Sequence, residues 1–309
     1  MRFETLTWVG GPDGFLELLD QRLLPGRRET VRCTEPAALF EAIRTLAVRG
    51  APAIGVAAAY GVCLAAQGVP DGGGPAGALA AIGRACDFLA ASRPTAVNLS
   101  WAVQRMRNRA ALFAEQRPEA SVDALRECLL GEARAIHAED RAMCEAIGRH
   151  GQRLVPDGGA VLTHCNAGAL ATAGIGTALA PLYLAHAAGR RFTVYVDETR
   201  PLLQGSRLTA WELTEAGIDA VLVCDAMAPS LMADGTVAAV ITGADRIAAN
   251  GDTANKIGTL GLSLAAVHYG VPFYVAAPSS TFDLGLANGS QIPIETRSGA
   301  EICTFGDRT

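Results

Sequence analysis

The second half of the chain alternates short runs of apolar, β-branched residues with longer amphipathic segments. The runs have the length of buried strands, and the segments between them have helical spacing. This alternation is typical of βαβ units, in which parallel strands are joined by helices. We expect strands at Ala160–His164, Phe192–Val196, Ala220–Cys224, Val237–Ile241 and Phe273–Ala277. We expect helices at Ala169–Ala188, Arg207–Ala216, Ser230–Ala233 and Lys256–Tyr269.

The first half of the chain has a different pattern. Residues 3–8 and 29–33 alternate in the manner of strands and lie on either side of a Gly-Gly-Pro turn, which predicts a small antiparallel sheet. From Glu35 to about Leu154 the apolar spacing is helical, with breaks at glycine and proline clusters. We therefore expect an α/β protein of two domains. Residues 1–154 would form a smaller, mainly helical domain with a short β-sheet, and residues 155–309 a Rossmann-like domain with a parallel sheet.

Composition argues against several functional classes. The chain has 26 basic and 31 acidic residues, a net charge of −5 and no run of lysine and arginine, so no nucleic-acid partner is expected. None of the eight cysteines has CxxC spacing, so no metal site is expected. The uncharged stretches Ala51–Val69 and Ala167–Ala185 are rich in alanine and glycine, which favours buried helices over membrane spans. An acidic residue at Glu4 argues against a secretory signal and favours a cytoplasmic protein.

Side chains that can take part in chemistry follow the predicted strands. Cys165 follows the first strand, Asp197 the second, Asp225 the third and Asp245 the fourth. The carboxyl ends of parallel strands meet at one edge of the sheet, where ligands bind. Cys165 also precedes a predicted helix, whose N-terminus would stabilise a thiolate. A buried cysteine without a role and helix-capping carboxylates remain alternatives, and position alone does not select among the three carboxylates.

Two other features of this edge narrow the possibilities. His164 should point away from Cys165, because neighbouring strand residues face opposite sides, and we expect it to pack in the core. The glycines after the first strand, at positions 168, 174 and 176, do not form a GxGxxG fingerprint. This argues against a classical dinucleotide site.

Three segments place a basic residue near the start of a predicted helix, where backbone N–H groups and positive charge bind phosphate. They begin at Arg49-Gly50-Ala51, at Arg93-Pro94-Thr95 and at Asn255-Lys256. Each alone is more often a solvated loop, but together with the sheet edge they indicate a small phosphorylated substrate. Lys256 is the only lysine among the 26 basic residues, which suggests a position that needs a compact ammonium group.

These segments belong to a set of long motifs that occur in a recognisable order. The set consists of Val48–Gly55, Ser92–Leu99, Thr163–Gly168, Asp197–Pro201, Gln204–Thr209, Gly243–Ile247 and Asn255–Thr259. With these motifs the chain resembles the sugar-phosphate isomerases typified by methylthioribose-1-phosphate isomerase, which are related to regulatory subunits of translation initiation factor 2B. The resemblance spans nearly the whole chain. Members of that family usually continue for a further segment after the Ile292–Arg297 motif, which leaves the C-terminal part and the C5 specificity unassigned.

The resemblance implies a function, a partner and a set of site residues. The activity would be aldose–ketose isomerisation of 5-methylthioribose 1-phosphate in methionine salvage, by a homodimer that needs no cofactor. Alternatives are isomerisation of 5-deoxyribose 1-phosphate or ribose 1,5-bisphosphate, or a non-catalytic regulatory role. Cys165 and Asp245 would be the catalytic pair. The implied substrate contacts are Arg49, Gly50, Ala51, Arg93, Gln204, Asn255 and Lys256.

The implied chemistry sets a physical requirement. An aldose 1-phosphate is locked as a ring, because its anomeric oxygen is esterified, so an acid must help to open it. We assign this role to Asp245, kept protonated by an apolar, water-poor pocket that Val240, Ile241 and Ala244 would help to form. Cys165 would then relay a proton through an enediol or stabilise a hydride shift from C2 to C1. The sequence leaves both routes open.

Overall fold

The structure is a computed structural model that describes residues 3–94 and 96–303 of the 309. Thr95 in the second predicted phosphate segment, and the first two residues of the chain, lie outside the described part. The chain divides into two compact units. The helical unit contains residues 3–143 and 170–174, and the sheet unit contains residues 144–169 and 175–303.

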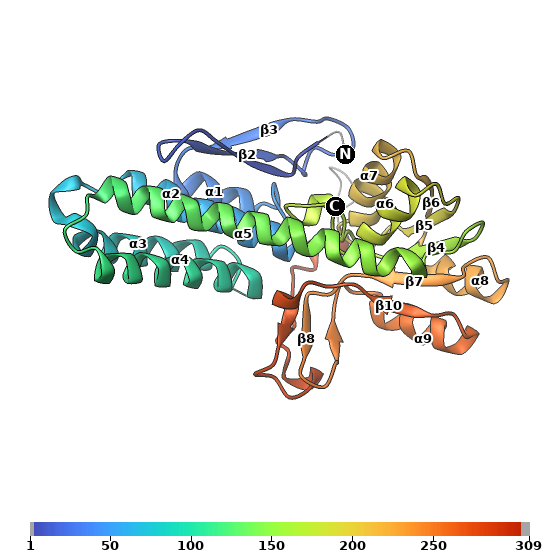
Figure 1. The fold of residues 1–309 in the computed structure, drawn as a ribbon. Helices are drawn as coiled ribbons and strands as arrows, with labels where there is room; N and C mark the ends of the chain where they lie inside the picture. The colour runs from blue at the N-terminus through green and yellow to red at the C-terminus, as the bar shows by residue number, and fades with distance from the viewer. Residues whose placement is uncertain (1–2, 95, 304–309) are drawn as a thin grey trace. The chain divides into compact units, whose positions relative to one another are not determined.

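The helical unit begins with the predicted small antiparallel sheet (Figure 1). Its strands β1 (Leu6–Val9), β2 (Phe15–Leu19) and β3 (Thr30–Cys33) pair in sequence order, and β2 was not foreseen. Leu16 and Leu18 alternate with less buried residues of β2 and enter the core, as expected for a sheet with one covered face.

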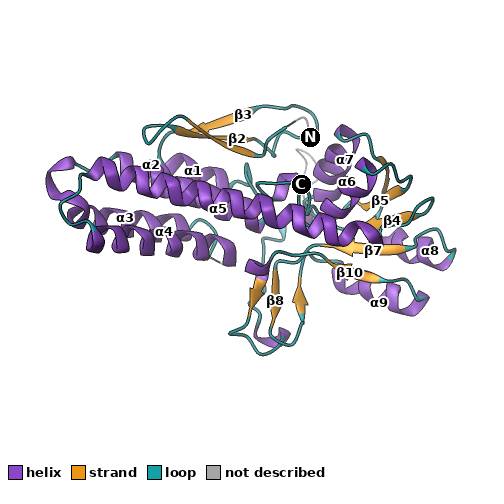
Figure 2. Ribbon diagram, in the orientation of Figure 1, coloured by secondary structure: helices purple, strands orange, loops and turns teal. Residues whose placement is uncertain are grey.

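Long helices complete this unit, and Figure 2 shows them running side by side. They are α1 (Pro36–Arg44), α2 (Ala51–Gln67), α3 (Gly74–Ala90), α4 (Val97–Gln116) and α5 (Val122–Gly151), the last continuing into the sheet unit. Alanine and glycine let α2 approach its neighbours closely: a Cβ at Gly55 would lie 2.9 Å from the carbonyl oxygen of Asn98 on α4. The first uncharged stretch is therefore a buried helix, as predicted.

One bent pair of helices has the length and composition of a membrane span. No single helix in the described ranges is long and apolar enough to cross a membrane. The segments Ala51–Gln67 and Asp71–Ala90 reach that length and composition only together, across an 87° bend.

The sheet unit contains the predicted five-stranded sheet, and every strand pair in it is parallel. The spatial order is β10-β7-β4-β5-β6. The strands are β4 (Ala160–Thr163), β5 (Thr193–Asp197), β6 (Asp219–Val223), β7 (Ala239–Thr242) and β10 (Phe273–Val275). All five overlap the predicted runs, so the α/β class with a Rossmann-like sheet is confirmed.

Helices cover both faces of this sheet. They are α6 (Ala180–Ala187), α7 (Ala210–Glu215), α8 (Ala228–Ala233) and α9 (Thr259–Tyr269). Residues of α6 and α7 pack with Val161 and Ile241 in one apolar cluster. Residues of α8 and α9 pack with Leu162 and Val240 in another, because successive strand residues point to opposite faces.

Two helix predictions need correction. The helix expected at Ala169–Ala188 is α6 alone, preceded by an irregular segment with one 3-10 turn at Ala169–Ala171. The irregular path includes Gly176, which has a φ of 90°. The second uncharged stretch, Ala167–Ala185, is therefore mostly not helical. The helix expected from Lys256 begins at Thr259, after a left-handed Gly258.

A second small sheet in this unit was not predicted. It joins β8 (Arg246–Ala248), β9 (Thr253–Ala254) and β11 (Phe282–Asp283), with β8 in the centre. The unit also contains short 3-10 segments and a last short helix, α10 (Ala300–Cys303).

Candidate active site

The sheet has one topological switch point, and both predicted catalytic residues follow strands that border it. From β4 the chain proceeds outward to β5 and β6, and then returns to build β7 and β10 on the other side. Cys165 comes two residues after the end of β4, and Asp245 comes three residues after the end of β7. Their loops touch, since a Cβ at Gly243 would lie 2.8 Å from the Cβ of Ala167. Ligands of open α/β sheets bind at such a point.

The backbone of Cys165 is held in an unusual conformation. Its φ is +66°, a region that residues with a side chain rarely adopt, and it is 8% exposed. Its N–H donates to Oγ1 of Thr199 at 2.8 Å, and its carbonyl accepts from Oγ1 of Thr209 at 2.6 Å. The predicted helix N-terminus is absent here, so our expected source of thiolate stabilisation was wrong.

A buried carboxylate holds the loop after Cys165, and sequence analysis missed it. Glu212 on α7 is fully buried. It accepts hydrogen bonds from Nδ2 of Asn166, from the N–H of Ala169 at 2.7 Å and from the hydroxyl of Tyr183 at 3.0 Å. Burial and the charge of Glu212 raise the pKa of Tyr183 well above its ordinary value, which keeps that hydroxyl a donor.

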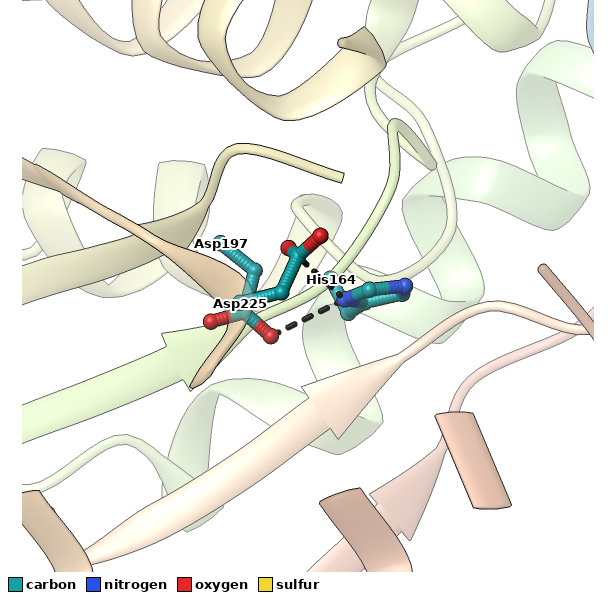
Figure 3. A group of neighbouring side chains, drawn as sticks. All are labelled: His164, Asp197 and Asp225. Carbon is teal, nitrogen blue, oxygen red and sulfur yellow. Dashed lines mark hydrogen bonds and ion pairs between the residues drawn. The ribbon is translucent and has the colours of Figure 1, made fainter. Parts of the chain in front are cut away.

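His164 is part of a hydrogen-bond network, which corrects the expectation that it only packs in the core. Figure 3 shows its ring beside the carboxylates of Asp197 and Asp225. Nδ1 lies 2.9 Å from Oδ2 of Asp197 and 3.9 Å from Oδ1 of Asp225. Nε2 lies 2.8 Å from the carbonyl oxygen of Ile257. The ring faces two of the strand-end carboxylates.

The same three side chains could be considered as metal ligands, because one ligand atom from each lies within 4.8 Å of the others. Most of their polar atoms are, however, engaged in hydrogen bonds, and the exception is Oδ1 of Asp197, which is buried and has no partner among the described residues. Both ring nitrogens of His164 face oxygen atoms, and Asp225 accepts from the N–H groups of Thr199 at 2.7 Å and Arg200 at 2.8 Å. A cation would have to displace these bonds, so the donor set fits a structural network better than a metal centre.

Asp245 does not lie in the enclosed pocket that we expected. Its side chain is exposed. Val240 and Ile241 are buried in the two clusters on opposite faces of the sheet, so they do not line a common pocket around it. The backbone of Asp245 is fixed, because its N–H donates to the carbonyl of Ala254 at 2.9 Å.

The remaining predicted residues of the sheet unit lie just before helical segments. Gln204 is 7% exposed, and its Oε1 has no hydrogen-bond partner among the described residues. The π-helical turn Gly205–Thr209 follows it. Asn255 donates to Oγ1 of Thr259 at 3.1 Å, and Lys256 is half-buried beside it.

The predicted phosphate residues of the helical unit lie at or before helix N-termini. Arg49, Gly50 and Ala51 mark the start of α2, as predicted. Gly50 has a φ of 92°, and a Cβ there would lie 2.5 Å from Cα of Ala171. Arg93 precedes α4, which begins at Val97.

Comparisons with known proteins show the family of this chain. The model of the Initiation factor 2 subunit family matches residues 47–309. The chain is 54% identical to the 5-deoxyribose 1-phosphate isomerase of Moorella thermoacetica, over 99% of this chain and 86% of the relative. It is 58% identical to the methylthioribose-1-phosphate isomerase of Gemmatimonas aurantiaca, over 93% of this chain and 81% of the relative.

Solved structures of two proteins also match nearly the whole chain. The 5-methylthioribose 1-phosphate isomerase of Pyrococcus horikoshii superposes with a TM-score of 0.89 at 39% identity, over 98% of this chain and 83% of the other. A structure described as the delta subunit of translation initiation factor eIF-2B from A. fulgidus superposes with a TM-score of 0.86 at 42% identity, over 99% of this chain and 86% of the other.

Proposed function

Because this chain belongs to the initiation factor 2 subunit family, and within it to the group of the methylthioribose-1-phosphate isomerases, we propose that it is a sugar-phosphate isomerase. Its substrate is 5-methylthioribose 1-phosphate, and its product is 5-methylthioribulose 1-phosphate. The observation that carries the proposal is the position of Cys165 and Asp245 after the two strands that border the switch point. The names of relatives at 54% and 58% identity support the reaction class.

Asp245 opens the sugar ring in this proposal. Its carboxyl group gives a proton to the ring oxygen while the bond from that oxygen to C1 breaks. Asp245 is exposed, so the bound sugar has to displace water from around its carboxyl group before the ring opens.

Cys165 assists the second step. Hydrogen moves from C2 to C1, and the C2 hydroxyl gives up its proton as C2 becomes a carbonyl. That proton replaces the one that Asp245 gave to the ring oxygen, so the step needs no oxidant or reductant. The fixed backbone on both sides of Cys165 suits a thiol that must keep one position through the reaction.

The proposed substrate contacts have complementary chemistry. Arg49 and the α2 N-terminus at Gly50 and Ala51 supply the charge and N–H groups that bind phosphate, and Arg93 supplies a second guanidinium. In the sheet unit, Gln204, Asn255 and Lys256 supply amide and ammonium donors for sugar hydroxyls. The C5 substituent is the least constrained part, and 5-deoxyribose 1-phosphate is the main alternative because one relative carries that name. Ribose 1,5-bisphosphate is a further alternative.

A time course by phosphorus and carbon NMR tests the proposal. The purified protein is mixed with 5-methylthioribose 1-phosphate, 5-deoxyribose 1-phosphate or ribose 1,5-bisphosphate. Formation of a ketose 1-phosphate is expected in the first mixture. Faster conversion of another sugar would reassign the C5 group, and no conversion of any of them would overturn the isomerase proposal.

Three variants then test the residues. Cys165→Ser and Asp245→Asn are expected to lose at least 10²-fold in kcat, in the range typical for a lost acid, base or charge-stabilising group. Cys224→Ser is the matched control, because Cys224 also follows a strand of this sheet but is exposed. Equal activity of Cys165→Ser and the control would overturn the assignment of Cys165.

A non-catalytic regulatory role is the second candidate, favoured by the match to a protein described as a translation factor subunit. In that case sugar phosphates would raise the melting temperature without being converted. A homodimer, a cytoplasmic location and a place in methionine salvage also stay predictions, and sedimentation velocity tests the first of them.

A further inference from the structure

We propose that Glu212 is a positioning residue that holds Cys165 and the loop after it in the conformation used for catalysis. Only the expected effect of Glu212 on turnover rests on the proposed function. In structural terms, a buried carboxylate on α7 maintains the strained backbone of Cys165, just after the end of β4. The Cys165 loop is defined here as residues 165–169.

The backbone at Cys165 is strained. A cysteine with a φ of +66° is less stable than one in the β or α region, so neighbouring bonds must hold it there. Both backbone polar groups of Cys165 are bonded to threonine hydroxyls, those of Thr199 and Thr209. Such conformations persist only where surrounding structure determines them.

Glu212 is connected to these bonds through Asn166. The side chain of Asn166, the residue after Cys165, donates to both Oγ1 of Thr209 and Oε1 of Glu212. The other carboxylate oxygen accepts from the N–H of Ala169, at the end of the loop. Glu212 therefore links the beginning of the loop to its end.

The loop backbone packs tightly against the Glu212 carboxylate, and hydrogen-bond donors surround it. A Cβ on Gly168 would overlap the Glu212 carboxylate, so the loop backbone lies directly against it. Donors from Asn166, Ala169 and Tyr183 surround the two carboxylate oxygens, an arrangement that suits an acceptor-only group. An amide in its place would present an NH2 group to at least one of these donors.

The test therefore uses Glu212→Gln, which keeps the size of the side chain but adds a donor. We expect amide hydrogen exchange in residues 166–169 to become at least 10-fold faster. We also expect alkylation of Cys165 by iodoacetamide, measured by peptide mass spectrometry, to become at least 10-fold faster. Exposed Cys224 provides the internal reference rate. Glu215→Gln, at the end of the same helix, is the matched control and should change neither rate.

The kinetic expectation separates positioning from general destabilisation. A thiol displaced by about 1 Å can lose on the order of 10²-fold in turnover, so kcat of Glu212→Gln should fall by about that factor while KM stays within about 3-fold. A thermal scan and the exchange of β4 and β5 amides verify that the sheet is intact.

A second variant, Thr209→Val, provides the test if Glu212→Gln does not fold. Thr209→Val removes the hydroxyl that donates to Cys165 and accepts from Asn166, with almost no change in volume. It should produce the same pattern at smaller amplitude. Unchanged exchange and unchanged alkylation in a folded variant would overturn the positioning role. Because neither measurement needs substrate, this failure can be told apart from failure of the isomerase proposal.

Discussion

His164 donates a hydrogen bond from Nε2 to the carbonyl oxygen of Ile257, 2.8 Å away, and this bond requires a proton on that ring nitrogen. A carbonyl only accepts, so Nε2 carries a proton. Nδ1 faces the carboxylate of Asp197, with Asp225 also nearby, and both favour a second proton there. Through these contacts the ring links the loop that carries Cys165 to the loop that carries Lys256.

Replacement of His164 should change how stability depends on pH. Burial acts to lower the pKa of His164, but the hydrogen bonds to Asp197 and Ile257 and the nearby charges outweigh it, so the pKa is raised above 6.5. The stabilisation is complete below 6.5 and is lost as pH rises through the native pKa. Denaturant unfolding from pH 6 to 9 should show a loss of stability in the wild type that His164→Asn lacks. His186→Asn, exposed on α6, should follow the wild type, and parallel curves for both variants would contradict the prediction.

Asp140 should change the pH dependence of stability in a lower pH range than His164. Burial raises the pKa of this carboxyl from 3.8 to about 6, although the N–H of Ala173, 2.7 Å from Oδ2, partly opposes the shift. The native state then keeps a proton that the unfolded chain releases, so the unfolding free energy should fall by up to about 3 kcal/mol between pH 4 and 6. Asp140→Asn should remove this slope. Asp123→Asn, on the exposed side of the same helix, should keep it.

Gly50→Ala should destabilise the protein strongly. A φ of 92° disfavours any side chain, typically by ~1–3 kcal/mol, and the added Cβ would also meet Ala171. In contrast, Gly77→Ala on α3 places its Cβ in open space and should stabilise by roughly 0.5–1 kcal/mol. Urea unfolding of both variants measures the difference. A Gly50→Ala protein as stable as Gly77→Ala would show that the backbone at α2 can relax.

Lys256→Arg tests whether the only lysine is needed as a lysine. If a compact ammonium binds the sugar phosphate, the planar guanidinium should raise KM by 10-fold or more, whereas the charge alone is unchanged. Arg84→Lys, the opposite exchange at an exposed position on α3, is the control and should leave KM unchanged. An unchanged KM in Lys256→Arg would mean that any cation suffices at this position.

The strands were predictable because their signal is local. The central strands β4 and β7 are buried along their whole length, so each appears in the sequence as a short apolar run, such as that around Val161 or Val240. Their order could then place Cys165 and Asp245 at one sheet edge. The starts of α2 and α4 were also readable, because Pro52 and Pro94 mark helix boundaries.

The errors have equally specific causes. The alanine content of residues 169–188 favoured a helix over the glycines at 174 and 176, although these glycines were the signal against it. The partners of His164 come from residues 197, 225 and 257, which no local pattern connects. Glu212 lies in a short amphipathic helix where an acidic residue normally faces water. Strands of two or three residues, such as β9, are too short to show any periodicity.

The excursion of residues 170–174 into the helical unit has a consequence during synthesis. Gln21 donates to the carbonyl of Leu170 at 2.7 Å, and Asp140 accepts from Ala173, so this unit needs five residues that follow Cys165 in the chain. On the ribosome, the N-terminal part cannot complete its contacts until residue 174 has left the exit tunnel, by which time the first strand of the parallel sheet has also been made. A protein cut after residue 154 would therefore yield an N-terminal fragment that lacks part of its own interior, and the two pieces would have to assemble as a complemented pair.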